Sequence, residues 1–257
     1  MPRWMGILLA FSAGGCSGNN HAAASSATVA QALYSSDYSS VLAELKRSFP
    51  QEYKIILQQL AVAQNAGLSA REDVLRNFLD RVAALIGSKS REIANAPDDR
   101  LAAFAKARAL VASELSGDDE VCAAFLQGST EPGRAADKVI PPDQLKANND
   151  MLVTELAAAH TGSVHPISRP PQQLEDSFKL ALVNLRSRSP QSYDLAVNGN
   201  LPSATAAERC RFVVAFTAAQ ASLPVSSAGA VISREFAFRT SAGADSAAKV
   251  RKQLLPA

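Results

Sequence analysis

The sequence predicts an all-α protein: a multi-helix bundle built from two related helical units that are joined by a helical, proline-rich connector. Three observations predict this fold class. Alanine supplies 48 of the 257 residues, and it has the highest intrinsic helix propensity because it loses no side-chain entropy in a helix. Apolar residues recur at helical spacing along most of the chain. A distinctive sequence pattern also occurs in both halves, with further matches in the same order.

Composition excludes several other classes of protein. Hydrophobic residues make up 47% of the chain, which is far too many for a wholly disordered protein. The formal net charge is only +2, whereas nucleic-acid-binding domains are usually strongly basic. We therefore expect a folded protein with no nucleic-acid partner, organised as one large domain or two small ones.

The first sixteen residues have the pattern of an export signal. Met1–Arg3 carries a positive charge, Trp4–Phe11 is a short apolar run, and small residues lead to Cys16. The segment resembles a bacterial lipoprotein signal, and this resemblance implies cleavage before Cys16 and lipidation of that cysteine. The alternative is conventional cleavage at the small residues Ala22–Ala24, which releases a free periplasmic or secreted protein.

This signal predicts where the protein acts. We expect residues 1–16 to act as the export signal, with cleavage before Cys16, and residues 17–30 to form a flexible tether. No later stretch of 18 uninterrupted apolar residues occurs, so the lipid anchor is the only expected membrane attachment. The predicted location is the bacterial cell envelope, either lipid-anchored on the periplasmic side of a membrane or free in the periplasm.

Export also bears on the two remaining cysteines. The periplasm is oxidising, and Cys122 and Cys210 form an even pair once Cys16 is assigned to lipid. We therefore predict a disulfide between them. The alternative is that both are small buried side chains with free thiols.

The evidence for two related units is a shared pattern of spaced residues. Leu42–Tyr53 and Leu182–Tyr193 both read L-x-x-L-[K/R]-x-x-x-P-Q-x-Y, 140 residues apart. Two further matches follow each copy: a helix start at Ser69 and Thr205, then SREIA from Ser90 and SREFA from Ser233. We interpret this as an old duplication that produced units 31–117 and 168–257. Coincidence within an alanine-rich helical chain is the alternative.

The repeated Pro-Gln-x-Tyr sequence has two interpretations. Tyr53 and Tyr193 are candidate binding residues, because each offers a flat apolar ring and a hydroxyl group. We favour the other interpretation, in which the motif is a repeated structural joint between two helices.

Turn and capping residues divide the first unit into helices. Pro50 fits the first turn of a helix that ends at Gly67. The next helix begins at Ser69, which forms a capping box with Glu72. A third helix follows Pro97 and ends at Gly117.

The connector, residues 118–167, contains two expected helices, Val121–Leu126 and Leu145–His160, and proline-rich loops. It has three basic and eight acidic residues, whereas residues 168–257 have eleven basic and six acidic ones. We therefore expect the connector to lie against the second unit. The helical spacing of apolar residues predicts five helical segments in that unit. They cover 174–185, a stretch that ends at Gly199, Thr205 to Pro224, a stretch that runs through Phe238, and 245–254.

No sequence motif for catalysis, phosphate binding or zinc binding occurs in the chain. Glu155, His160 and His165 are the only arguable metal cluster, and their spacing keeps them off a common helix face. We predict no catalytic residue, no metal ligand and no cofactor. The acidic pairs beginning at Glu72 and Asp98 lie at predicted helix starts, where their negative charge complements the exposed backbone N–H groups. We therefore interpret them as capping residues.

These observations favour a non-catalytic protein that binds another protein, such as an immunity protein, an inhibitor or an assembly factor. One alternative is a periplasmic carrier of a small molecule, because paired helical layers can enclose an apolar cavity. The other is an enzyme that acts on the cell wall, with Glu72 or His160 as the least unsuitable catalytic residue.

Overall fold

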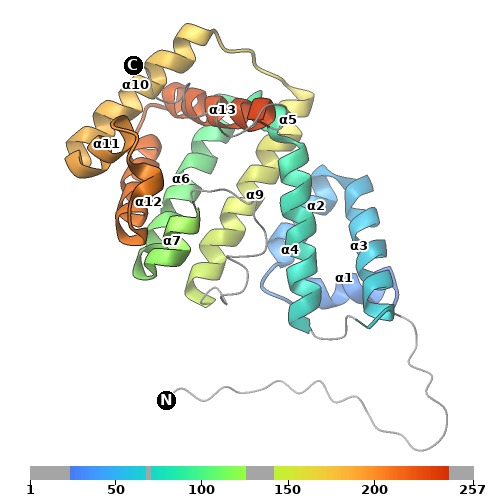
Figure 1. Cartoon of the computed structure of the whole chain (residues 1–257). Coiled ribbons are helices and arrows are strands. Elements are labelled where there is room, and N and C mark those ends of the chain that lie inside the picture. The colour runs from blue at the N-terminus through green and yellow to red at the C-terminus, as the bar shows by residue number, and fades with distance from the viewer. Residues whose placement is uncertain (1–23, 68–70, 126–141, 243–257) are drawn as a thin grey trace, which may run out of the picture.

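The computed structural model describes residues 24–67, 71–125 and 142–242. Within these ranges the chain forms twelve α-helices and two short 3₁₀ helices but no strand (Figure 1). The all-α prediction is therefore confirmed. The helices are α1 (Ser26–Tyr34), α2 (Ser39–Ser48), α3 (Pro50–Asn65), α4 (Arg71–Ser88), α5 (Ser90–Ala94), α6 (Asp98–Glu114), η1 (Leu115–Gly117), α7 (Asp119–Phe125), α9 (Pro142–Val164), α10 (Pro171–Arg188), α11 (Pro190–Val197), η2 (Leu201–Ser203), α12 (Ala206–Ala221) and α13 (Val225–Ala242).

Proline and glycine set many of the helix ends. Pro50, Pro171 and Pro190 are the first residues of α3, α10 and α11. Proline is tolerated there because a backbone N–H at the first position of a helix has no hydrogen-bond partner within the helix. Gly67 and Gly199 follow α3 and α11 with φ angles of 112° and 70°. Only glycine adopts this left-handed region at no steric cost, so the chain reverses there as the sequence predicts.

Helix α6 lies at the centre of the fold. It packs against α9 on one side and against α12 and α13 on others (Figure 1). Many of its side chains are alanine, which lets the neighbouring helices approach closely. The buried residues of α6 are Leu101, Ala102, Phe104, Ala105, Arg108, Val111 and Ala112.

The apolar core crosses the boundary between the two expected units. The largest cluster of buried apolar residues draws on α1 to α6 and α9, and it also includes Ile232 and Phe236 of α13. The rings of Phe104 and Phe236 meet at 5.7 Å. A second cluster comprises α10, α12 and α13 with Ala102 of α6, and a third joins α6, α7, α9 and α12. The two units therefore share their cores.

The loop before α10 ties the connector to the corner between α5 and α6. Arg169 is almost fully buried and donates hydrogen bonds to the carbonyl oxygens of Ala94 and Ala96, at 3.0 and 2.6 Å. Its guanidinium also pairs with Asp98 at 2.6 Å. The described contacts of Arg169 in this proline-rich loop are therefore structural.

The connector differs from its expected packing. Its short helix α7 packs against α12 of the second unit, as expected from charge, but the long helix α9 packs against α2, α5 and α6 of the first unit. The reason is apolar burial, because Leu156, Ala158 and Ala159 of α9 are fully buried in the first cluster. This burial outweighs the attraction between weakly charged, solvated surfaces.

Two expected boundaries also shift. Helix α9 covers Pro142–Val164, longer at both ends than the expected helix. Helix α1 begins at Ser26, inside the expected tether, because Val29 and Leu33 bury their side chains in the core and Ser25 caps the helix. The capping box expected at Ser69, residues 126–141 of the connector and the helix expected over 245–254 lie outside the described residues.

The repeated motif forms the same joint in both halves. Phe49 and Ser189 adopt similar backbone angles between two helices, with φ of −138° and −150° and ψ of 64° and 88°. One turn earlier, Lys46 and Arg186 each place a cation over the ring of the motif's tyrosine, at 5.9 and 5.5 Å. Beyond the joints the packing differs, since α10 packs on α12 whereas α2 packs on α9. The internal duplication is not confirmed and stays a prediction.

Candidate functional site

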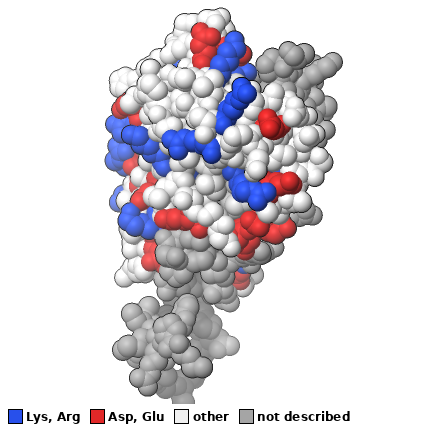
Figure 2. Space-filling view, turned by 90° about the vertical axis from the view of Figure 1, so that its left-hand side faces the viewer, with Lys and Arg blue, Asp and Glu red and all other residues white. Residues whose placement is uncertain are grey.

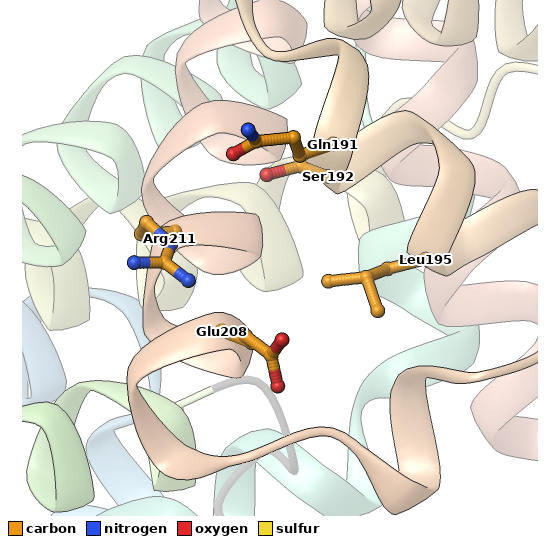
Figure 3. A pocket seen from close by; sticks show the side chains of 5 residues that line it. All are labelled: Gln191, Ser192, Leu195, Glu208 and Arg211. Atoms are coloured by element: carbon orange, nitrogen blue, oxygen red, sulfur yellow. The ribbon is translucent and has the colours of Figure 1, made fainter.

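A shallow polar pocket lies between α11 and α12 (Figure 3). Its volume is about 280 Å³, and its lining combines an amide, a hydroxyl, a carboxylate, a guanidinium and one leucine. These side chains belong to Gln191, Ser192, Leu195, Glu208 and Arg211. The pocket can therefore offer hydrogen bonds and both signs of charge to one ligand group.

The local sequence fixes the α11 wall of the pocket. Ser189 precedes Pro190 and caps α11, because its Oγ accepts a hydrogen bond from the backbone N–H of Ser192. The same Oγ donates to the Ser192 hydroxyl at 2.7 Å. Ser192 is almost fully buried, so the joint that carries the repeated motif also sets the position of the pocket wall.

A capping box fixes the α12 wall. Thr205 accepts a hydrogen bond from the backbone N–H of Glu208, and the Glu208 carboxylate accepts from the Thr205 backbone N–H and hydroxyl, both at 2.8 Å. These hydrogen bonds to the charged form lower the pKa of Glu208 below its ordinary value. Glu208 is therefore a fixed negative charge at the pocket edge at neutral pH.

Arg211 supplies the positive charge of the pocket. It lies three residues after Glu208 on α12, and its side chain is exposed. No described side chain forms an ion pair or hydrogen bond with it. Arg186 and Arg188 lie in the last turn of the neighbouring helix α10. Figure 2 faces this side of the molecule and shows basic side chains spread across it above a group of acidic ones.

A second, more apolar pocket lies between α1 and α3 and has a volume of about 250 Å³. Tyr53 lines it, and burial together with a hydrogen bond to Tyr34 raises the pKa of the Tyr53 hydroxyl. The other lining residues are Ser26, Ala27, Ala30, Lys54, Leu57 and Gln58. This pocket is at the opposite end of the fold from α11 and α12 (Figure 1).

The structure separates the two candidate binding tyrosines. Tyr53 packs against the first apolar cluster and Tyr193 against the second, so they do not form one site. Tyr193 does not line the α11–α12 pocket, although Gln191 and Ser192 of the same motif do. Both tyrosines stack with a cation from the preceding helix, which supports the structural-joint interpretation.

Sequence reasoning identified part of this pocket for another reason. A helix start is predicted at Thr205, and the structure forms a capping box there between Thr205 and Glu208. Arg211 carried no sequence signal, because an arginine on an exposed helix position is common. Only the packing of α11 on α12 brings Arg211 beside the motif residues Gln191 and Ser192.

The structure brings the two predicted disulfide cysteines together. Cys122 of α7 and Cys210 of α12 are bonded, with their Cα atoms 5.1 Å apart, and both are buried. Their separation in the chain is 88 residues. The predicted lipidation site, Cys16, lies outside the described residues.

The candidate catalytic groups have structural partners where they are described. His160 meets the ring of Phe49 edge-on at 6.1 Å, and Asp98 pairs with Arg169. Within residues 24–67, 71–125 and 142–242, no three His, Cys, Asp or Glu side chains are grouped to hold a metal ion. The Glu72 side chain lies outside the described residues.

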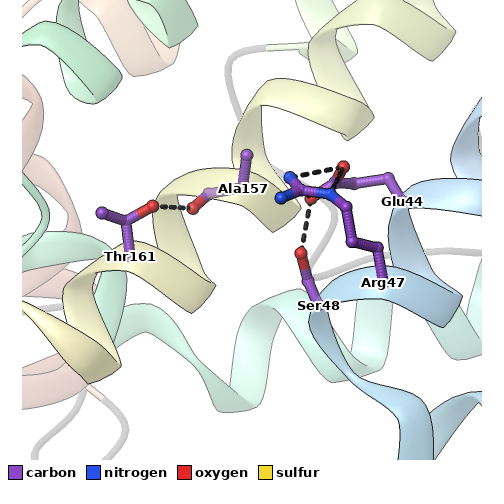
Figure 4. Close-up of polar contacts among 5 residues, drawn as sticks. All are labelled: Glu44, Arg47, Ser48, Ala157 and Thr161. Atoms are coloured by element: carbon purple, nitrogen blue, oxygen red, sulfur yellow. Dashed lines mark hydrogen bonds and ion pairs between the residues drawn. The ribbon is translucent and has the colours of Figure 1, made fainter.

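The buried carboxylate of Glu44 is also occupied by neighbours (Figure 4). Arg47 donates to it at 2.7 and 3.0 Å, and the Ser48 hydroxyl donates at 2.5 Å. All three residues lie on α2, beside α9, where Thr161 bonds its own helix at Ala157. This arrangement satisfies a buried charge next to α9 and offers no open oxygen for catalysis.

Nothing in the described ranges suggests a membrane span, since none of their helices is both long and apolar enough to cross a bilayer. Comparison of the whole chain with protein-family models, with curated proteins and with solved structures finds no match.

Proposed function

We propose that this chain is an exported, lipid-anchored protein of the bacterial envelope that acts by binding another protein without catalysis. The export signal ending at Cys16 supports the location. The observation that supports the binding role is the α11–α12 pocket, in which exposed Arg211 faces capped Glu208. An immunity protein, an inhibitor or an assembly factor would use such a surface.

The chemistry of the pocket suits a protein partner. Arginine is enriched in protein interfaces and often dominates their binding energy. A partner carboxylate pairs with Arg211, while a partner amide or hydroxyl bonds Glu208 and Gln191. The α11–α12 pocket is lined mainly by polar and charged side chains, whereas small-molecule sites are lined mostly by apolar ones. The pocket lining therefore favours the protein binder over the carrier.

The experiment is affinity isolation of the mature protein from crosslinked envelopes of the native organism, with three versions of the bait. Wild type is compared with Arg211→Glu, which reverses the charge in the pocket. The matched control is Arg76→Glu on α4, an exposed arginine on another part of the fold. Bound proteins are identified by mass spectrometry and quantified against an unrelated lipoprotein.

We expect wild type and Arg76→Glu to recover the same bound protein in similar amounts. The amount recovered with Arg211→Glu should be about tenfold lower, which corresponds to a loss of about 1.4 kcal/mol of binding free energy. If all three baits recover the partner equally, the α11–α12 pocket is not the binding site. If wild type recovers no protein above the level of the unrelated lipoprotein, the proposed binding function is wrong.

A further inference from the structure

The exposed face of α3 carries two large apolar side chains. Ile55 and Val62 are 50% and 68% exposed, and their spacing of seven residues places them on the same side of the helix, two turns apart. The remaining exposed side chains of this helix are uncharged apart from Lys54. No acidic side chain of α3 is fully exposed, since Glu52 is partly buried.

A pair of hydrogen bonds fixes where the N-terminal segment leaves the fold. Asn65, at the end of α3, accepts from the backbone N–H of Ala24 at 2.7 Å and donates to its carbonyl oxygen at 3.0 Å. Val62 precedes Asn65 by three residues, which is about one helical turn, or 5 Å along the axis. The chain therefore departs toward Cys16 from beside the exposed apolar face of α3.

The length of the intervening chain limits how far this face can be from an anchor. Seven residues, 17–23, lie between Cys16 and Ala24, which makes eight Cα–Cα steps of at most about 3.6 Å each, so the tether reaches at most about 29 Å. Helices α11 and α12, whose residues line the polar pocket, lie at the opposite end of the fold from α1 and α3 (Figure 1). An acyl chain on Cys16 therefore holds the α1–α3 end near the bilayer and the α11–α12 end away from it.

We infer that the outer face of α3, centred on Ile55, Val62 and Lys54, rests on the lipid surface when the chain is anchored at Cys16. Shallow insertion buries the two apolar side chains at the boundary between headgroups and acyl chains, and Lys54 meets anionic headgroups. This inference rests on the lipid anchor of the proposed function. It orients the protein so that the α11–α12 pocket faces a partner in the aqueous space.

A tryptophan reporter tests this contact directly. The only tryptophan of the chain, Trp4, precedes Cys16, so a chain that begins at Cys16 contains none. Val62→Trp therefore gives a single fluorophore on α3. The matched control is Val183→Trp on α10, where the native valine is 62% exposed. Both residues are valine on an exposed helix face, so the tryptophan's own affinity for membranes is the same in each variant.

Each variant, starting at Cys16, is coupled through that thiol to a maleimide phospholipid in vesicles of phosphatidylethanolamine and phosphatidylglycerol. Fluorescence is compared between vesicles with and without brominated acyl chains. We expect brominated lipid to quench about half of the emission of Val62→Trp and to leave Val183→Trp nearly unchanged, because the α3 face inserts several ångströms. Equal quenching at both positions, or none at either, overturns the inference and leaves α3 for a protein partner.

The native anchor is tested separately by the intact mass of the protein isolated from its envelope. An acylated chain starting at Cys16 supports the anchor, and a chain starting near Ser25 contradicts it. The vesicle experiment supplies its own anchor, so it decides the α3 contact whichever mass is found. Failure of the anchor and failure of the α3 contact therefore give different results.

Discussion

At the scale of single residues, two glycines set how closely helices approach the α5–α6 corner. A Cβ atom at Gly162 of α9 would lie 1.8 Å from the carbonyl oxygen of Glu92. A Cβ at Gly229 of α13 would lie 2.5 Å from the Asp98 carboxylate. These positions accept no side chain unless the backbone or a buried ion pair moves, because protein interiors are close-packed.

We predict that Gly162→Ala lowers the free energy of unfolding by about 3 kcal/mol, since the backbone of α5 must shift to admit the methyl group. The control is Gly87→Ala in α4, where a Cβ meets nothing within 4 Å. That variant should gain about 0.5–1 kcal/mol from helix propensity. Urea unfolding followed by circular dichroism measures both. Equal effects of the two substitutions would contradict the close approach.

The capping box at α12 predicts a pH dependence. The pKa of Glu208 is lowered by its hydrogen bonds to Thr205, so its charged form stabilises the folded state. This contribution is fully present above the unfolded pKa of about 4.3 and is lost as the pH falls through the folded pKa. The stability difference between wild type and Glu208→Gln should therefore be constant near neutrality and shrink in acid. A difference that does not vary with pH in urea unfolding would show that the charge has no role.

At the scale of elements, α7 depends on a covalent bond for its position. The helix has only seven residues, too few to be stable alone in water. It packs on α12, where Cys122 and Cys210 meet inside the third apolar cluster. The bond therefore holds a short connector helix against the second unit, next to the α12 helix that carries the pocket.

We predict that replacing both Cys122 and Cys210 by alanine lowers the free energy of unfolding by about 4 kcal/mol, because the bond closes a loop of roughly 90 residues in the unfolded chain. Wild type treated with reductant should show a similar loss, and the double variant should not respond to reductant. Thiol alkylation with intact-mass measurement confirms the redox state. Two thiols that react in the untreated protein would contradict the bond.

At the scale of the whole molecule, the two sequence units depend on each other. Phe236 of the second unit is fully buried within the cluster formed mainly by the first. Arg108 of α6 pairs with Glu235 of α13 at 2.5 Å, and both side chains are largely buried. Separating the units would break this ion pair and expose apolar surface to water, which is costly.

We therefore predict one cooperative unfolding transition for the full chain in calorimetry, with equal calorimetric and van't Hoff enthalpies. Fragments 31–117 and 168–257, produced separately, should show no cooperative transition. Two transitions in the full chain, or independent folding of either fragment, would instead indicate autonomous domains.

The helical class and many helix ends of this protein follow from local sequence alone. Proline at the start of α3 and α11, glycine after them, and the capping box at Thr205 act over a few residues, so local sequence is sufficient to predict them. The sequence also predicted the pairing of Cys122 with Cys210, because the expected lipidation of Cys16 leaves only these two cysteines to pair.

Which helices contact one another depends instead on tertiary packing. The acidic composition of the connector suggested that it lies on the second unit, yet α9 packs on the first because its buried apolar face fits there. The pocket depends in the same way on α11 packing against α12, which brings Arg211 beside Gln191 and Ser192. Such contacts join residues far apart in the chain through burial and shape, and these properties arise only when the helices pack together.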